Sequence, residues 1–286
     1  MTIRNAFEQY VKSLSSIYEK KEAESISLLM FEERVGLTKS DLILRGEESM
    51  SEVKANDLTW KLLRLMKGEP VQYVLGYCYW FGMKLKVNKH VLIPRPETEE
   101  LVEWIIKENQ TRGDLKILDI GAGSGCIAIA LKKNIPTSEV FAMDISKDAL
   151  QVARENAEQN QAEVSFIFDD ILYPKSDHSS SPIQYSLIVS NPPYVPESEK
   201  PGLHENVLNF EPAAALFVPN TNPLIFYNAI IEFATRHLAV NGELFFEVNP
   251  FYATDVAKQL QSNGFSQSEI RTDLSGKYRM IRASRQ

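Results

Sequence analysis

Asn191-Pro192-Pro193-Tyr194 is the stretch of this 286-residue sequence whose residue types point most directly to chemistry. The residue before a proline is kept out of the helical region, so Asn191 is expected to be extended. Pro192 and Pro193 have fixed φ angles and no N–H, which leaves a stiff turn with carbonyl acceptors. The Asn191 side-chain oxygen beside the Pro192 carbonyl offers two acceptors, suited to holding an NH2 group by both hydrogens. Tyr194 adds a flat ring face for a planar group.

A glycine-rich loop is the second candidate site. It is made of Gly121, Ala122, Gly123, Ser124 and Gly125. Glycines let the backbone approach a ligand closely, and the N-terminus of a helix presents free N–H groups. A dinucleotide fingerprint requires Gly-x-Gly-x-x-Gly or Ala, whereas position 126 is Cys. By itself, the loop is equally compatible with a nucleoside cofactor site and with a tight structural turn.

Asp144 favours the cofactor site. It ends the second predicted strand, where a carboxylate can accept hydrogen bonds from both hydroxyls of a ribose. Its alternative role, capping the next helix, would be filled equally well by Ser146. Loop and acid together indicate a ribose-bearing cofactor, and without a Gly-Lys-Ser/Thr loop a nucleoside triphosphate is disfavoured. Cys126 is interpreted as a small buried residue, because the sequence identifies no histidine partner for it.

Alternating strand and helix patterns position these candidates. The expected strands are Lys116–Ile120, Glu139–Met143, Val164–Phe168, Tyr185–Ser190 and Glu243–Val248. The expected helices are Leu101–Ile106, Ile127–Leu131 and one capped by Ser146 that contains Leu150, Val152 and Ala153. This alternation predicts an α/β fold with a mostly parallel sheet covered by helices on both faces. Both candidate stretches follow strands, where α/β proteins place their sites.

The first ~68 residues are expected to form short helices, with Ser40 and Ser51 as N-caps. An apolar stripe at helical spacing is made of Leu58, Leu62, Leu65 and Met66, widened by Trp60 and Leu63. Residues 71–93 are rich in aromatic side chains and predict a β-hairpin. The expected domains are a helical bundle at 1–70, a hairpin linker at 71–93 and a main domain at 94–286. Residues 175–182 predict a polar loop.

Composition restricts the function classes. The hydrophobic content of 44% and charged content of 24% are ordinary for a globular protein. The net charge of -7 argues against a protein that grips a long nucleic-acid backbone. Two cysteines without a CxxC pattern and four scattered histidines indicate neither a disulfide framework nor a metal site. The sequence shows no signal-peptide core and no run of membrane-spanning length, so a soluble, cytoplasmic protein is expected.

Taken together, these features resemble the class I S-adenosylmethionine-dependent methyltransferases, and more narrowly the release-factor glutamine methyltransferases. Further stretches that resemble family signatures are Gly68–Gly76, Leu92–Glu99, Phe210–Leu216 and Leu274–Lys277. Asn-Pro-Pro-Tyr alone is shared with DNA-adenine and RNA-guanine methyltransferases, whereas Pro-Arg-Pro-Glu-Thr-Glu makes the narrower resemblance specific. That family methylates the side-chain amide nitrogen of the glutamine in the Gly-Gly-Gln tripeptide of class I translation termination factors.

The resemblance implies a Rossmann-like methyltransferase sheet, S-adenosylmethionine as cofactor and class I peptide chain release factors as protein substrate. Gly121 to Gly125 would bind the methionine part of the cofactor and Asp144 its ribose, while Asp170 and Ile171 would lie along the adenine. Asn191 to Tyr194 would hold the substrate amide, with Asn191, Pro192 and Tyr194 as catalytic residues and Asn191 also bordering the cofactor. The N-terminal helices would contact the release factor. A monomer without direct nucleic-acid or membrane contact is expected.

Three positions depart from the family pattern. Ala122 replaces a common threonine, Asn249 stands where glycine is usual, and Tyr252 stands where glutamine is frequent. The last two leave the local loop geometry open. An amide nitrogen is a poor nucleophile, and no side chain at neutral pH is basic enough to deprotonate it first. The mechanistic hypothesis is that Asn191 Oδ1 and the Pro192 carbonyl accept its hydrogens and aim its lone pair at the sulfonium methyl.

Two alternative functions are kept. One is a methyltransferase acting on an exocyclic amino group of a nucleic-acid base. Such an enzyme extracts the base and grips the backbone, which the acidic charge and the small helical start disfavour. The other is a binding module that holds the cofactor without catalysis, which the intact Asn-Pro-Pro-Tyr stretch disfavours.

Overall fold

The computed structural model describes residues 1–175 and 183–285. The polar loop predicted at 175–182 therefore lies, after its first residue, outside the described residues. The chain divides into two compact units. The first comprises Met1–Gly76 with His204–Phe210, and the second comprises Tyr77–Leu203 with Glu211–Gln286. Each is described by itself.

The first unit is a helical bundle, as predicted. Its helices are α1 (Ile3–Leu14), α2 (Lys20–Val35), α3 (Lys39–Leu44), α4 (Glu52–Leu65), α5 (Val71–Leu75) and α9 (Glu205–Phe210). Its buried core includes Tyr10, Leu14, Met30, Phe31 and Leu65. Gly36, with φ 73°, ends α2 in the left-handed conformation that glycine adopts without a steric penalty.

The caps and the exposed face of this unit correct two expectations. Ser51 caps α4, as predicted, but α3 is capped by Thr38 and not by Ser40. Thr38 is the N-cap because it forms a reciprocal capping box with Asp41. Leu58 and Leu65 are buried on α4, whereas Trp60 and Leu63 are 72% and 51% exposed. The predicted widening of the buried stripe is therefore wrong at these two positions.

The region between the bundle and the sheet contains a shorter hairpin than predicted. Val71–Leu75 form the helix α5, which Pro70 precedes and which ends at Gly76 in the left-handed conformation. The hairpin is confined to β1 (Tyr77–Trp80) and β2 (Met83–Lys86), which pair in antiparallel register. Phe81 and Gly82 at its turn both have positive φ, as a tight two-residue hairpin requires. The strand prediction is wrong for 71–75 because one turn of helix buries apolar residues as well as a strand does.

The second unit is built on a sheet whose described strands number seven, in the order β10-β11-β9-β6-β3-β4-β5. The strands are β3 (Lys116–Ile120), β4 (Glu139–Asp144), β5 (Val164–Phe168), β6 (Tyr185–Ser190), β9 (Leu238–Glu247), β10 (Phe265–Thr272) and β11 (Tyr278–Arg285). β5, β4, β3, β6 and β9 run parallel, and β11 and β10 continue the sheet antiparallel. A mostly parallel sheet was predicted and is confirmed.

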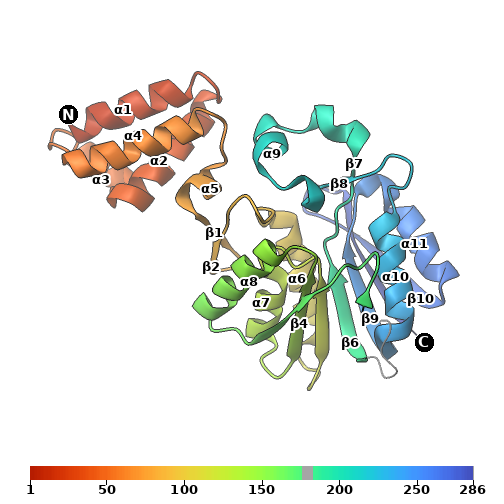
Figure 1. Ribbon diagram of the computed structural model, residues 1–286. Coiled ribbons are helices and arrows are strands. Elements are labelled where there is room, and N and C mark those ends of the chain that lie inside the picture. Colours follow the sequence, from red (N-terminus) through yellow and green to blue (C-terminus); the bar gives the residue numbers. More distant parts are fainter. Residues whose placement is uncertain (176–182, 286) are drawn as a thin grey trace. The chain divides into compact units, whose positions relative to one another are not determined.

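Helices cover both faces of this sheet (Figure 1). α6 (Pro96–Asn109), α7 (Cys126–Asn134) and α8 (Lys147–Gln159) pack on one face, and α10 (Ile225–His237) and α11 (Ala253–Ser262) pack on the other. Successive residues of one strand enter opposite cores, since Ile117 joins the first and Leu118 the second. Short elements complete the unit: β7 (Val195–Pro196), β8 (Phe217–Val218), η2 (Glu197–Gly202), η3 (Ala213–Ala215) and η4 (Pro250–Tyr252). Over the described residues, every helix is too short or too polar to span a bilayer.

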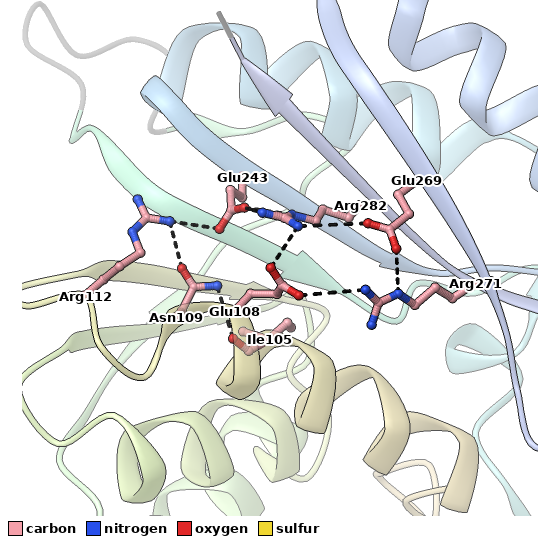
Figure 2. A network of polar contacts seen from close by, with 8 residues as sticks. All are labelled: Ile105, Glu108, Asn109, Arg112, Glu243, Glu269, Arg271 and Arg282. Atoms are coloured by element: carbon pink, nitrogen blue, oxygen red, sulfur yellow. Dashed lines mark hydrogen bonds and ion pairs between the residues drawn. The ribbon is translucent and has the colours of Figure 1, made fainter.

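A charged network fastens the antiparallel end of the sheet to α6 (Figure 2). Buried Glu243 of β9 accepts from Arg112 at 2.9 Å and from Arg282 Nε at 2.7 Å. Arg282 also reaches Glu108 at 3.1 Å, and Arg271 lies 3.7 Å from the same carboxylate. The network joins three strands to the end of one helix, away from the carboxyl ends of the parallel strands.

Candidate active site

The site lies where the strand order reverses. The chain runs from β3 through β4 to β5 on one side, then returns to β6 and β9 on the other. In open α/β sheets, ligands bind beyond the carboxyl ends of the strands at such a switch point. Ile120 and Ser190, at the ends of β3 and β6, are register partners, and Ser190 Oγ donates to the Ile120 carbonyl at 2.6 Å. The glycine loop and the Asn191 stretch therefore start side by side.

The glycine loop is held in shape by backbone conformation. φ is positive, at 78°, 54° and 79°, in Gly121, Gly123 and Gly125. Only glycine adopts these values without strain. The N–H groups of Gly121 and Ala122 donate to the Met143 carbonyl, and that of Gly123 donates to Asp144 Oδ2 at 2.8 Å. The amides of these three residues therefore tie the loop to the end of β4.

Asp144, the last residue of β4, keeps acceptor capacity. Its Oδ2 accepts from Gly123 and its Oδ1 from the Ser146 N–H, both at 2.8 Å. A carboxylate offers about four lone-pair sites, so each oxygen retains one. Burial raises the pKa of Asp144, and the backbone hydrogen bonds oppose that shift. Ser146 caps α8 by accepting from the Ala149 N–H at 3.1 Å, so the capping role is filled without Asp144.

A cavity of about 380 Å³ opens at these strand ends, within the range of small-molecule sites. The predicted site residues that line it are Gly121, Ala122, Gly123, Ser124, Asp144, Asp170, Ile171, Asn191, Pro192 and Pro193. Gly125 and Tyr194 are not among its lining residues. A Cβ on Gly125 would come within 3.1 Å of Ala153 Cβ, so this glycine permits close helix packing.

The walls of the cavity combine carboxylates with aliphatic side chains. Ile145 and Ile171, after β4 and β5, are aliphatic lining residues close in sequence to the carboxylates of Asp144 and Asp170. Asp119, behind the loop, is fully buried, and its Oδ1 has no hydrogen-bond partner in the described part of the chain. Burial raises the pKa of Asp119 to about 7. Cys126 is buried and its pKa is raised to about 12, as expected of a packing residue.

The Asn191 stretch is anchored by residues to which the sequence assigned no role. Asn191 Nδ2 donates to Thr98 Oγ1 at 3.1 Å, and the Thr98 hydroxyl donates to Glu247 Oε2 at 2.6 Å. The Tyr194 hydroxyl donates to Glu247 Oε1 at 3.1 Å, so the tyrosine is tied to this carboxylate. Thr98 lies in the family-like stretch Leu92–Glu99 and Glu247 lies two residues before Asn249, but their 149-residue separation gave no sign that they meet.

Local sequence explains how Thr98 comes to this place. Arg95 is extended, as the residue before a proline is, and Pro96 begins α6, so Thr98 lies in the first turn of the helix. Buried Glu211 accepts from Arg95 at 2.6 Å and from the Ile93 N–H at 3.1 Å. These bonds join the Leu92–Glu99 and Phe210–Leu216 stretches beside the cavity.

The departures from the family pattern are accommodated. Ala122 is buried and lines the cavity. Asn249 Nδ2 donates to the Tyr194 carbonyl at 3.2 Å, and its Oδ1 accepts from the Phe251 N–H at 3.0 Å. Asn249 thereby ties the turn at η4 to the Asn191 stretch. Tyr252 ends η4.

Comparison with known proteins defines the class. The family model "Methyltransferase small domain" matches residues 98–214, and the model "PrmC N-terminal domain" matches residues 5–76. The fold is similar to that of the T. thermophilus 16S rRNA N2 G1207 methyltransferase, solved with AdoMet and guanosine. That similarity has a TM-score of 0.52 at 16% identity and covers 73% of this chain and 50% of that one. This chain is an S-adenosylmethionine-dependent methyltransferase.

Relatives of nearly full length specify it further. The chain is 42% identical to the release factor glutamine methyltransferase of Flavobacterium psychrophilum, over 99% of each chain. It is 40% identical to the release factor glutamine methyltransferase of Bacteroides thetaiotaomicron, over 98% of this chain and 100% of that protein. The chain belongs to the release factor glutamine methyltransferase family.

Proposed function

We propose that this chain transfers a methyl group from S-adenosylmethionine to the side-chain amide nitrogen of the glutamine in the Gly-Gly-Gln motif of class I peptide chain release factors. The observation that carries the proposal is the placement of Asn191, Pro192 and Pro193 on the wall of the cavity that the glycine loop also lines. Family membership supports a glutamine amide as the acceptor.

The cofactor roles are proposed residue by residue. Bound S-adenosylmethionine supplies a methyl group made electrophilic by a positively charged sulfur. Gly121 to Ser124 hold its methionine part, Gly125 completes the loop behind them, and the open lone pairs of Asp144 accept from its ribose hydroxyls. Asp170 and Ile171 border its adenine. The cavity volume and the mixture of carboxylate and aliphatic walls fit such a group.

The substrate amide is oriented by fixed acceptors. Asn191 Oδ1 and the Pro192 carbonyl accept its two N–H hydrogens, which aims the nitrogen lone pair at the methyl group. The nitrogen becomes positive as its bond to the methyl group forms and the sulfur–methyl bond breaks, and acceptor dipoles already in place stabilise that charge. One of the two amide protons leaves during or after transfer. Alignment of the reacting atoms contributes as well, up to roughly 7–11 kcal/mol for well-oriented pairs. Tyr194 completes the stretch, and a stacking role for its ring stays a prediction.

Recognition of the release factor is assigned to the N-terminal helices. Large apolar side chains are exposed on two of these helices, namely Ile43 and Leu44 on α3 and Val53, Trp60 and Leu63 on α4. The helical spacing of Val53, Trp60 and Leu63 puts these three on one side of α4, and exposed apolar patches are typical of protein interaction sites. In the proposed division of labour, residues 1–70 recognise the release factor, 71–93 link and 94–286 carry out the transfer.

The remaining expectations from the sequence are kept as proposals. The protein acts in the cytoplasm as a monomer, without membrane attachment and without gripping nucleic acid directly. The net charge of -7 supports the last point, because nucleic-acid affinity depends on neutralising phosphates with cations.

Methyl incorporation tests the proposal. The chain is incubated with S-adenosylmethionine labelled in its methyl group and a class I release factor, beside a release factor whose Gly-Gly-Gln glutamine is alanine and beside ribosomal RNA. Label is expected only in the release factor that keeps its Gly-Gly-Gln glutamine. Equal labelling of both proteins would reject the glutamine as acceptor, and labelling of RNA alone would favour the nucleobase alternative.

A further inference from the structure

A chain of three hydrogen-bonded side chains reaches from the core to the cavity. Glu247 ends β9 with 1% of its surface exposed, and Thr98, in the first turn of α6, has 2% exposed. The Thr98 hydroxyl donates to Glu247 Oε2 at 2.6 Å, and Asn191 Nδ2 donates to Thr98 Oγ1 at 3.1 Å. Only Asn191 and Thr98 of the three line the cavity.

The chemistry of these side chains determines which group donates and which accepts in each of the two hydrogen bonds. An ionised carboxylate only accepts, so the single hydroxyl hydrogen of Thr98 is committed to Glu247. The Thr98 oxygen can then only accept, which selects the Nδ2 side of the Asn191 amide as its partner. Asn191 Oδ1, on the other side of the amide, accepts no hydrogen bond from the residues that the structure describes.

Other contacts hold the carboxylate in place. The Tyr194 hydroxyl donates to Glu247 Oε1 at 3.1 Å, so each carboxylate oxygen has its own donor. The Tyr227 hydroxyl donates to the Glu247 backbone carbonyl at 3.1 Å. Burial raises the pKa of Glu247, while the bonds from Thr98 and Tyr194 and the charge of Arg279 oppose that shift.

We propose that Glu247 and Thr98 are positioning residues that fix the orientation of the Asn191 amide and so present Oδ1, not Nδ2, to the substrate. The inference rests on the proposed function, which requires an acceptor at this place. The terminal torsion of an asparagine has two similar minima, and a reversed amide would set its NH2 group against the NH2 group of the substrate. Both groups would then be donors, and the acceptor pair would be lost.

Substitutions of Thr98 separate this role from simple packing. Thr98→Val keeps the shape but removes the hydroxyl, and kcat is expected to fall about 10-fold with an unchanged dissociation constant for the cofactor. Thr98→Ser keeps the hydroxyl and is expected to stay within about 2-fold of the parent kcat. In Glu247→Gln the new amide can donate to Thr98, which reverses donor and acceptor in the hydrogen bonds to Thr98 and Asn191. This substitution is expected to lower kcat at least as much as Thr98→Val.

A double-mutant cycle is the decisive arm, because a residue that acts through Asn191 has no effect once Asn191 is gone. The rate of single-turnover methyl transfer is measured for Thr98→Val in the parent background and in an Asn191→Ala background. Glu247→Gln is measured in the same two backgrounds, in case the valine variant fails to fold. The proposal is supported if Thr98→Val lowers the rate of methyl transfer in the parent background and has no effect in the Asn191→Ala background. Equal losses in both, or full activity of Thr98→Val and Glu247→Gln, overturns it. Absence of methyl transfer by the unmodified chain would instead reject the proposed function.

Discussion

At the scale of single residues, the site is made of groups whose hydrogen-bonding capacity is used on one side and open on the other. Asn191 Nδ2 donates to Thr98, and each carboxylate oxygen of Asp144 accepts one hydrogen bond from a backbone N–H group. Such partial satisfaction fixes an orientation before any ligand arrives. It also leaves defined acceptors, which in the proposed function hold the substrate amide and the ribose of the cofactor.

Asn191→Ala is expected to lower kcat by about 10²–10³-fold, the range observed when one fixed dipole is removed from a reacting centre. The dissociation constant of S-adenosylmethionine should stay near that of the parent, because the glycine loop and Asp144 are unchanged. Titration calorimetry and labelled methyl transfer measure the two quantities separately. Asn263→Ala, on an exposed asparagine at the end of α11, is the matched control and should leave both unchanged. Parent-like turnover in Asn191→Ala would contradict the proposed mechanism.

Asp119 predicts a pH effect on stability. Its pKa is raised by burial from 3.8 to about 7 in the folded chain. Between these values the folded state holds a proton that the unfolded state has lost, so stability falls as pH rises, by at most about 1.4 kcal/mol per pH unit. The contribution is fully present below the unfolded pKa and is lost as pH passes through about 7.

Asp119→Asn removes this titration. Its stability relative to the parent chain should therefore rise across the window from pH 3.8 to about 7 and level off above it. Urea unfolding without cofactor, followed over that range, measures the difference. A difference that is flat with pH would show that Asp119 titrates normally.

At the scale of elements, the site depends on where parallel strands end. The ends of β3, β4 and β6 could be predicted because each strand is a short apolar run followed by glycine, aspartate or Asn-Pro. The helix α5 could not, since the one-turn stretch before Gly76 has the aromatic and apolar content of a strand. The contact between Thr98 and Glu247 could not be predicted either, because it depends on how α6 packs against β9, which no local sequence pattern encodes.

The charged network at the antiparallel edge gives a prediction at this scale (Figure 2). Glu243→Gln should destabilise the chain by about 2 kcal/mol, because two arginines lose their buried counter-charge but remain partly exposed. The control is Glu232→Gln, which breaks an exposed i,i+4 pair with Arg236 and should cost at most about 0.5 kcal/mol. Chemical denaturation measures both variants. Equal effects would show that the network does no more than an ordinary surface pair.

At the scale of the whole molecule, each unit has its own core and also leaves large apolar side chains exposed. The second unit has two cores, one on either face of the sheet, and exposes side chains such as Tyr173, Phe251 and Leu274. In the first unit, α3 and α4 together expose five large apolar side chains. The sequence predicted a helical bundle at the N-terminus. It could not predict which face is exposed, because Trp60 and Leu63 fit a widened buried stripe equally well.

Trp60→Ala tests the role of this face. Trp60 is 72% exposed, so the substitution should leave stability nearly unchanged. The KM for an intact release factor is expected to rise about 10-fold, as for a moderate interface residue, with kcat retained. A short Gly-Gly-Gln peptide, which lacks the rest of the release factor, should be methylated equally by both forms. An unchanged KM for the intact factor would place its recognition elsewhere.

The position of the transferred methyl group tests the central claim most directly. After reaction with a class I release factor, tandem mass spectrometry of its peptides locates the added group. The proposed function predicts one methyl group on the side-chain nitrogen of the Gly-Gly-Gln glutamine, which the parent chain adds and which Asn191→Ala adds far more slowly. A methyl group on any other residue, or an unmodified glutamine under conditions in which the cofactor binds, would contradict it.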